Sequence, residues 1–460
     1  MTRSRTVTAV LCVTLLFLIT GCFNSNGTDE TPPSKDAVCA AYLQAAETIR
    51  TADNLSVYIG TMTETTINGQ TYSLTSQQQM DFRTDSTNGF QASSNETVQI
   101  GAHKFTVSEL YSDDINYIQI NDHKFKSATT ADAFTDRFAP TVLLDCDLYK
   151  DIQFEQKNSS TAIAFSQPTG AEPWALPDGA EFLDGQGYAV LNSNGALTES
   201  SYTIRYLAGG ASVENTVKLI FHSADFQITP PENTESYTPL DCQDAPKRLE
   251  EAYGYLLQGT QMQSQSTESI YCQAFSISRS ETFALAMSGN ADSFFASMDA
   301  NVTQSNQSSG KKVLKQKELF QNGIYSISSN GGTAVENTSV DQAAMKAYCQ
   351  EYLTKNIFRP EQIVSATLSE TDSTYKIIIQ LDQSTAETIC TELCTVLYGE
   401  PTLLDTLASS SSIDAVEYIL EIDKHTSLPV AASLNFSATH IIETIPYQLT
   451  SQRTQSFQYQ

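Results

Sequence analysis

The amino-acid sequence predicts an α+β protein in which two antiparallel β-sheets follow one another along the chain, each with helices packed against it. Three observations support this prediction. Tyr and Phe, with 21 residues each, and abundant Thr favour strands. The order of the expected elements repeats once, and so does the spacing of two pairs of cysteines. At 460 residues the chain is also too long for one typical core, so two domains are expected.

The first half is expected to begin with a helix at 35–52. Its apolar stripe at near-helical spacing consists of Val38, Tyr42, Ala45 and Ile49. Strands follow, with a tight hairpin turn at Asn68-Gly69, and a second helix is expected at 130–150. The strands expected in this half are 55–65, 72–82, 90–100, 104–111, 116–121, 152–155, 161–165, 188–192, 197–206 and 214–221.

The second half is expected to repeat this order after a Pro-, Glu- and Thr-rich linker at 229–244. Helices are predicted at 246–258 and 340–356, and a further helix at 384–398 has no counterpart in the first half. The expected strands are 269–278, 281–288, 293–303, 313–320, 324–328, 362–368, 375–381, 416–423, 429–437 and 443–450.

Four cysteines support the repeat independently. The same number of residues separates Cys39 from Cys146 and Cys242 from Cys349, and the first member of each pair lies beside the first helix of its half. Free thiols of an exported chain meet an oxidising space. We therefore predict the disulfides Cys39–Cys146 and Cys242–Cys349, each joining the first helix of a half to its second.

Three more cysteines lie beyond residue 22, and their pairing stays open at this stage. Cys390 and Cys394 are four residues apart on a predicted helix and face the same way, and Cys272 lies in the first expected strand of the second half. A third disulfide between Cys272 and one of the other two would leave one free thiol. A metal site made of these three lacks the CxxC-type spacing of zinc sites, so disulfide plus free thiol is the favoured interpretation.

The first 22 residues are typical of an export signal. Arg3 and Arg5 precede an apolar stretch at 6–19 that is shorter than a membrane-spanning helix. Ile19-Thr20-Gly21-Cys22 then resembles the bacterial lipobox, which implies that Cys22 receives a diacylglyceryl group and becomes the new N-terminus. The polar residues that follow predict a disordered tether at 22–35. The chain is therefore expected on the extracytoplasmic face of the cell membrane, held by its lipid.

Neither the composition nor the motifs of the sequence indicate a particular reaction. The formal net charge of −27 disfavours nucleic acid as a partner, because both are anionic. The sequence has no G-x-S-x-G, P-loop or G-x-G-x-x-G motif. None of the five histidines has an H-x-x-x-H partner, and we expect no Cys/His cluster around any of them. Asp113-Asp114 and the pair Asp145 and Asp147 are interpreted as solvated surface. No catalytic residue, metal or cofactor is therefore predicted.

The order of elements, taken twice, resembles the LolA/LppX-like lipoprotein superfamily, although no specific sequence motif supports the resemblance. It implies two tandem, curved antiparallel half-barrels with helices across each concave face, at 36–228 and 245–460. The tandem copy and the predicted disulfides depart from the single-domain pattern of that superfamily. For this reason no ligand is carried over residue by residue. The resemblance implies only an apolar cavity able to hold acyl chains or another hydrophobic ligand.

The leading functional hypothesis is a non-catalytic, membrane-anchored lipoprotein that follows a signal peptide at 1–21 and binds a lipid-like or other hydrophobic ligand. The alternative is an envelope protein-interaction or sensor module without a small-molecule ligand, which would present sheet edges or its acidic surface to a protein partner.

Overall fold

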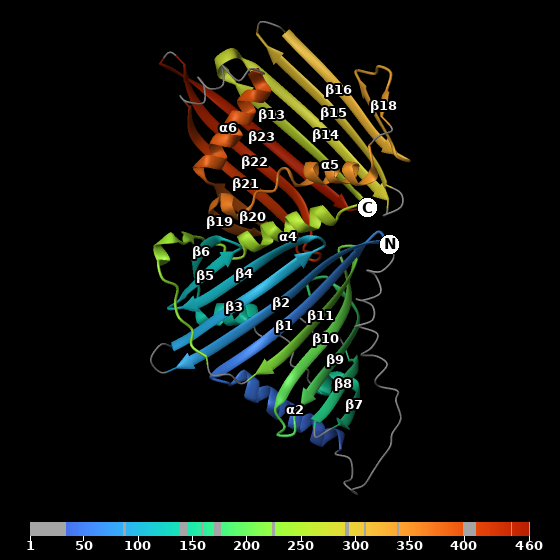
Figure 1. Cartoon of the computed structure of the whole chain (residues 1–460), viewed down its shortest axis with the longest axis vertical. Coiled ribbons are helices and arrows are strands. Elements are labelled where there is room, and N and C mark those ends of the chain that lie inside the picture. Colours follow the sequence, from blue (N-terminus) through green and yellow to red (C-terminus); the bar gives the residue numbers. More distant parts are fainter. Residues whose placement is uncertain are drawn as a thin grey trace.

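The computed structural model describes residues 34–460 except 86–88, 139–145, 158–159, 170–175, 223–225, 290–293, 308–309, 338–339, 399–410, 443 and 460. Within them the fold is mostly β, with a few helices and two large sheets (Figure 1). The predicted export signal, Cys22 and most of the predicted tether lie outside the described residues.

The first sheet has 12 strands in the order β12-β6-β5-β4-β3-β2-β1-β11-β10-β9-β8-β7. All neighbours are antiparallel except β12, which runs parallel to β6. The strands are β1 (Asn54–Ile67), β2 (Gln70–Asp85), β3 (Gly89–Ile100), β4 (His103–Ser112), β5 (Ile115–Ile120), β6 (His123–Ala128), β7 (Tyr149–Lys157), β8 (Ser160–Pro168), β9 (Glu181–Leu191), β10 (Leu197–Ala208), β11 (Ala211–His222) and β12 (Thr238–Pro239).

The second sheet has 11 antiparallel strands in the order β18-β17-β16-β15-β14-β13-β23-β22-β21-β20-β19. The strands are β13 (Met262–Cys272), β14 (Ile277–Gly289), β15 (Phe294–Asn306), β16 (Gly310–Gln321), β17 (Ile324–Ser329), β18 (Val335–Asn337), β19 (Ile363–Glu370), β20 (Thr374–Leu381), β21 (Ser411–Asp423), β22 (Pro429–Ile442) and β23 (Ile445–Tyr459).

The two sheets share one topology. In each, the first six strands form one wing and the next five form the other, and the first and last long strands of the unit pair at the centre, as β1 pairs β11 and β13 pairs β23. In the first sheet, β12 adds a twelfth strand beyond β6. This common order agrees with the predicted repeat at the level of topology. In the described part of the chain, the strands at the two ends of each order do not pair, so neither sheet closes into a barrel.

Five helices accompany the strands of the described chain: α2 (Lys35–Arg50), α3 (Ala131–Phe138), α4 (Ala245–Gln258), α5 (Gln342–Thr354) and α6 (Gln383–Tyr398). Side chains cap two of them, because Ser34 accepts a hydrogen bond from the Ala37 amide and Asp341 accepts one from the Ala344 amide. α6 lies between β20 and β21. The residues described between β8 and β9, the matching place in the first sheet, form no helix.

The predicted helix at 130–150 was wrong over its second part. α3 covers only its first turns, a short 3₁₀ segment covers Cys146–Leu148, and β7 begins at Tyr149. The stretch without strands expected between 165 and 188 is also shorter than predicted, because β8 extends to Pro168 and β9 begins at Glu181. In the predicted linker at 229–244, β12 pairs with β6 and therefore extends the first sheet.

α4 packs against both sheets (Figure 1). Its buried residues Leu249, Ala252, Tyr255 and Leu256 belong to a core cluster that includes Ile100 and Phe105 of the first sheet and Met262 and Leu285 of the second. The approach to the first sheet is close at Gly254, where an added Cβ would lie 2.8 Å from the Cβ of Ile100. Two smaller clusters fill the rest of the first unit, one beneath α2 and one around Phe134 of α3.

Polar contacts reinforce this joint between the sheets. The Gln258 side chain exchanges two hydrogen bonds with the backbone of Ser73, at 2.9 and 2.6 Å. Lys247 of α4 lies 2.7 Å from Glu96 on β3. Glu250 of α4 binds His103 of the first unit and Arg359 of the second, at 2.7 and 2.8 Å. Apolar packing and buried charge therefore both hold the two sheets against α4.

Candidate functional site

A pocket of about 420 Å³ lies between α5 and α6, over the centre of the second sheet. Figure 1 shows both helices lying across the same face of that sheet. Strands β13, β14 and β23 supply the floor: Ser266, Glu268, Arg279, Glu281 and Arg453. The helices and the turn after α5 supply the walls: Tyr352, Lys355, Asn356, Glu392, Leu393, Thr395 and Val396.

The floor of this pocket is charged, although it lies on the helix-covered face. Alternation along β13 turns Ser266 and Glu268 to the same side as buried Ile270, and on β14 Arg279 and Glu281 turn with Leu285. Arg279 pairs with Glu281 at 2.7 Å and Arg453 pairs with Glu268 at 2.7 Å. The family resemblance implies an apolar cavity, whereas the floor of this pocket is lined by ion pairs.

The charges that line the pocket balance. Three carboxylates (Glu268, Glu281 and Glu392) face three cations (Arg279, Lys355 and Arg453). Arg453 also donates to the Asn356 side chain at 2.8 Å, and burial raises the pKa of Tyr352 to about 12, so its hydroxyl stays protonated. The Nε of Arg279 is buried and has no acceptor among the described residues. This leaves a hydrogen-bond donor at the floor.

The helix-facing side of the first sheet carries a comparable polar band. Ser76 donates to Glu96 at 2.6 Å and Gln78 donates to Ser94 at 2.7 Å, with all four side chains buried. Lys247 of α4 supplies the opposite charge to Glu96. Because these polar groups hydrogen-bond and pair with one another, the band has a structural role inside the packed protein.

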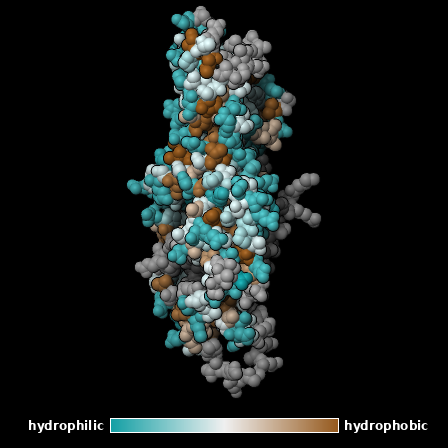
Figure 2. All heavy atoms as spheres, turned by 90° about the vertical axis from the view of Figure 1, so that its left-hand side faces the viewer, coloured by the Kyte–Doolittle hydropathy of each residue, from teal (hydrophilic) through white to brown (hydrophobic). Residues whose placement is uncertain are grey.

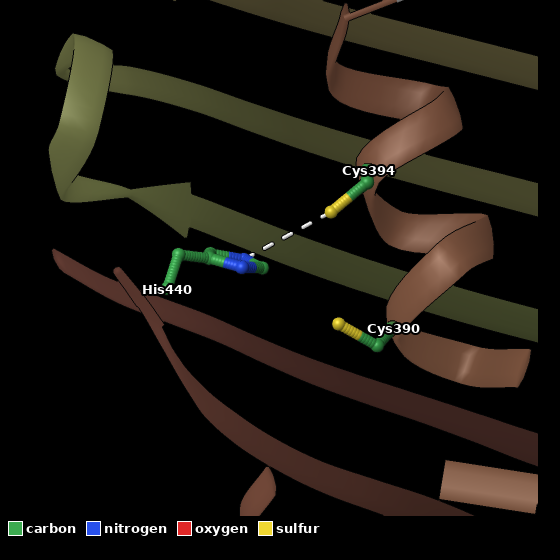
Figure 3. A group of neighbouring side chains, drawn as sticks. All are labelled: Cys390, Cys394 and His440. Atoms are coloured by element: carbon green, nitrogen blue, oxygen red, sulfur yellow. Dashed lines mark hydrogen bonds between the residues drawn. The ribbon is translucent and has the colours of Figure 1, made fainter. Parts of the chain in front are cut away.

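The structure brings Cys390, Cys394 and His440 together in the second unit (Figure 3). Their sulfur and ring-nitrogen atoms all lie within 4.8 Å of one another, and all three residues are buried. Cys394 Sγ is 3.9 Å from His440 Nε2. The two cysteines lie one turn apart on α6, whereas His440 projects from β22. The prediction that no histidine lies in a Cys/His cluster was therefore wrong for His440.

Neighbouring hydroxyls contact this cluster. The Ser411 hydroxyl is hydrogen-bonded to His440 Nδ1, which leaves Nε2 facing Cys394. Tyr398 donates to Cys272 Sγ at 2.8 Å, and Cys272 interacts electrostatically with Cys394. A hydrogen bond between the two thiols of α6 lowers the pKa of Cys390 and raises the pKa of Cys394. Cys272 is therefore a neighbour of the cluster but lies outside the group within 4.8 Å, and Cys272, Cys390 and Cys394 are all free thiols.

The four other predicted disulfide cysteines have different outcomes. Cys39 and Cys146 form the predicted disulfide, with their Cα atoms 6.0 Å apart. The predicted disulfide between Cys242 and Cys349 is not formed, and both are buried free thiols. Cys242 precedes the N-terminus of α4, where its amide binds Ala366, whereas Gln350, next to Cys349, binds the Leu257 carbonyl at the other end of α4. That helix is about 20 Å long at 1.5 Å per residue, too far for a disulfide.

Two other charged features of the sequence lie on the surface. Asp113 and Asp114 form a turn with positive φ, and Lys311, Lys312 and Lys315 of β16 are exposed. Figure 2 shows hydrophobic residues singly and in small groups among hydrophilic ones on the face that it displays. Within the described ranges, none of the helices has both the length and the apolar character needed to span a bilayer.

No protein-family model and no curated protein matches this sequence. Solved structures that resemble the chain include LprF from Mycobacterium bovis, with 11% identity over 47% of this chain and 92% of that chain, at a TM-score of 0.22. A DUF1329 family protein from Desulfovibrio piger has 11% identity over 43% of this chain and 95% of that chain, at a TM-score of 0.16. Likenesses this distant carry no conclusion about function.

Proposed function

We propose that this chain is a lipid-anchored extracytoplasmic lipoprotein that binds an amphipathic, lipid-like ligand without transforming it. The observation that carries the proposal is the pocket between α5 and α6, which has a charged floor and partly apolar walls. Its volume of about 420 Å³ lies within the range of small-molecule sites. The curved half-barrel that the family resemblance implies would present this pocket on its concave face.

The composition of the pocket indicates the kind of head group. Because carboxylates and cations balance, a ligand with a large net charge gains little there, whereas a zwitterionic or uncharged polar group can pair with both signs. Arg279 Nε offers a free donor at the floor. Leu393, Val396 and the ring of Tyr352 offer apolar contacts to the remainder of the ligand.

Membrane attachment is proposed to depend on Cys22. Replacing Cys22 with Ala is expected to release the chain from the membrane into the medium, because the acylated thioether can no longer form. Immunoblotting of membrane and soluble fractions measures this. Cys12→Ala is the matched control, since Cys12 lies within the predicted signal and its loss should leave attachment unchanged. Membrane retention of the Cys22→Ala protein would refute the lipid anchor.

Ligand binding is tested on the full chain, extracted from membranes in mild detergent and examined by native mass spectrometry and lipid extraction. We expect a co-purifying amphipathic molecule in the wild type. The variant Val396→Asp should lose most of it, because a carboxylate replaces an apolar wall of the pocket. Val364→Asp is the matched control, since Val364 is a similarly exposed valine on β19 outside the pocket. Equal ligand retention by the two variants would contradict the assignment of the pocket.

A protein-interaction module is the alternative, favoured by one edge of the second sheet. There β18 is the terminal strand, and Val335 is 67% exposed, the highest exposure among the large hydrophobic residues described. Open edges of this kind accept a further strand from a partner. A wild-type chain that binds no lipid-like molecule, but loses an envelope protein partner on Val335→Lys, would favour this alternative.

A further inference from the structure

The buried cluster on α6 and β22 has the chemistry of a metal site. Cys390, Cys394 and His440 offer two sulfurs and one imidazole nitrogen within 4.8 Å of one another. Thiolate and imidazole are the ligands typical of zinc, whereas calcium and magnesium require oxygen ligands. We propose that these three residues bind one Zn²⁺ ion. Cys272 lies outside this group, so water or a shifted Cys272 side chain would supply the fourth ligand.

The geometry around the histidine suits this role. Ser411 contacts Nδ1, so Nδ1–H can donate to the hydroxyl and Nε2 keeps its lone pair toward the sulfurs. Histidine ligands of metals usually make such a hydrogen bond through the other ring nitrogen, which fixes both tautomer and orientation. The separation of 3.9 Å between Cys394 Sγ and Nε2 is compatible with two ligands of one ion, with bonds of about 2.3 Å to sulfur and 2.0–2.1 Å to nitrogen.

Charge also favours a dication at this place. Two thiolates and a neutral imidazole around Zn²⁺ make a group of zero net charge, which can be buried at little electrostatic cost. When Cys272 joins as a third thiolate, Tyr398 donates a hydrogen bond to its sulfur at 2.8 Å and stabilises the added negative charge. The reaction releases the thiol protons to solvent and changes no oxidation state.

The position of the cluster gives the ion a structural role. α6 has no counterpart among the described residues of the first unit, and a shared ion would tie it to β22 through His440. Leu393 and Val396, which flank Cys394 on α6, are also walls of the pocket. The ion would therefore hold one wall of that pocket, although zinc binding itself does not depend on the proposed ligand.

The wild-type full chain provides the first test, purified without chelator and analysed by elemental mass spectrometry. We expect about one zinc per chain. After removal of the metal under reducing conditions, the protein should rebind one Zn²⁺ or one Co²⁺, and the cobalt form should show the absorption of tetrahedral thiolate ligation. Failure of the reduced chain to bind either ion would overturn the proposal, as would peptide mapping that finds Cys394 in a disulfide with Cys390 or Cys272. Copper in place of zinc would overturn the choice of metal.

Variants then test the ligand set. Cys394→Ser should weaken the cobalt thiolate absorption and His440→Gln should lower the affinity for cobalt, whereas Cys349→Ser, which changes a buried free thiol outside the cluster, should leave both unchanged. Ser411→Ala should lower zinc affinity about 10–100-fold, because Ser411 positions His440 without binding the ion. Unchanged affinity in Ser411→Ala and in His440→Gln would refute the assigned geometry.

Discussion

Replacing both Cys39 and Cys146 with Ala is expected to lower the free energy of unfolding by about 4–5 kcal/mol, because the disulfide closes a loop of roughly 100 residues in the unfolded chain. The two cysteines are 107 residues apart and join α2 to the segment that enters β7. α2 covers one of the two smaller core clusters of the first unit, so its detachment would expose Val38, Tyr42 and Ala45 to water. Urea unfolding followed by circular dichroism measures the change.

The matched control is the double variant Cys242→Ala and Cys349→Ala. The structure has these two residues as free buried thiols, so a reducing agent should destabilise this variant as much as it destabilises the wild type. The Cys39 and Cys146 variant should be insensitive to the same agent. If reduction leaves the wild type unaffected, or if non-reducing peptide mapping pairs Cys39 with another cysteine, the prediction is wrong.

The two cysteine pairs show how far sequence spacing can predict structure. Cys39 lies inside α2, whereas Cys242 precedes the start of α4, so equal spacing does not place the pairs equivalently. Cys349 lies on α5, where burial and the charge of Glu318 raise its pKa to about 12. The strands of the two halves correspond in order and pairing, but the cysteines do not occupy corresponding positions in them.

Local signals predicted most strands correctly, but the predicted strand at 269–278 was wrong, because a turn at Gln273–Phe275 divides it between β13 and β14. Asn68-Gly69 has positive φ at both positions and forms the tight turn expected of this pair, and Asn322-Gly323 has the same conformation between β16 and β17. β6 was missed because its sequence is mainly polar, although Phe125 and Ser127 alternate toward the buried face. The end of the predicted helix at 130–150 was missed because the disulfide at Cys146 and the start of β7 are tertiary features.

The candidate sites were harder to predict from the sequence than the strands were. Strand alternation places His440 on the buried face with Phe436 and Ala438, a signal that could have shown it to be internal. Its approach to Cys394 depends on how α6 crosses the sheet, which no local pattern encodes. Likewise, Glu268 and Arg279 are polar strand residues usually expected to face solvent, yet they form the floor of the pocket.

Replacing Glu250 with Ala is expected to lower the free energy of unfolding by about 3–5 kcal/mol, because it removes one partner of a buried ion pair at the joint between the two sheets. The Glu250 side chain is 1% exposed. Arg359 donates three hydrogen bonds to its two carboxylate oxygens, at 2.8–3.0 Å, and His103 lies 2.7 Å away. Arg359 also lies over the ring of Tyr253. Without the carboxylate, the guanidinium and imidazole would both lose their acceptor inside the joint.

The acid dependence of stability provides a second readout of the same group. Burial raises the pKa of Glu250, but the hydrogen bond from His103 and the charge and hydrogen bonds of Arg359 outweigh it, and the net pKa is lowered below 4.5. A carboxyl group whose pKa is lower in the folded than in the unfolded state stabilises the protein at any pH above its unfolded pKa. This contribution is lost as the pH falls through the folded pKa. Wild-type stability should therefore decrease below about pH 4.5, and Glu250→Gln should remove part of that slope.

Glu421→Gln is the matched control for both measurements. Glu421 pairs with Lys376 at 2.8 Å on the surface of the second sheet, with side-chain exposures of 29% and 36%. Exposed pairs of this kind contribute about 0–1 kcal/mol, so the control should unfold nearly as the wild type does. Equal effects of Glu250→Ala and Glu421→Gln in urea would contradict the proposed joint. A larger effect of Glu250→Ala, accompanied by protease cleavage around α4, would show that this carboxylate couples the two sheets, because α4 is the helix on which both cores meet.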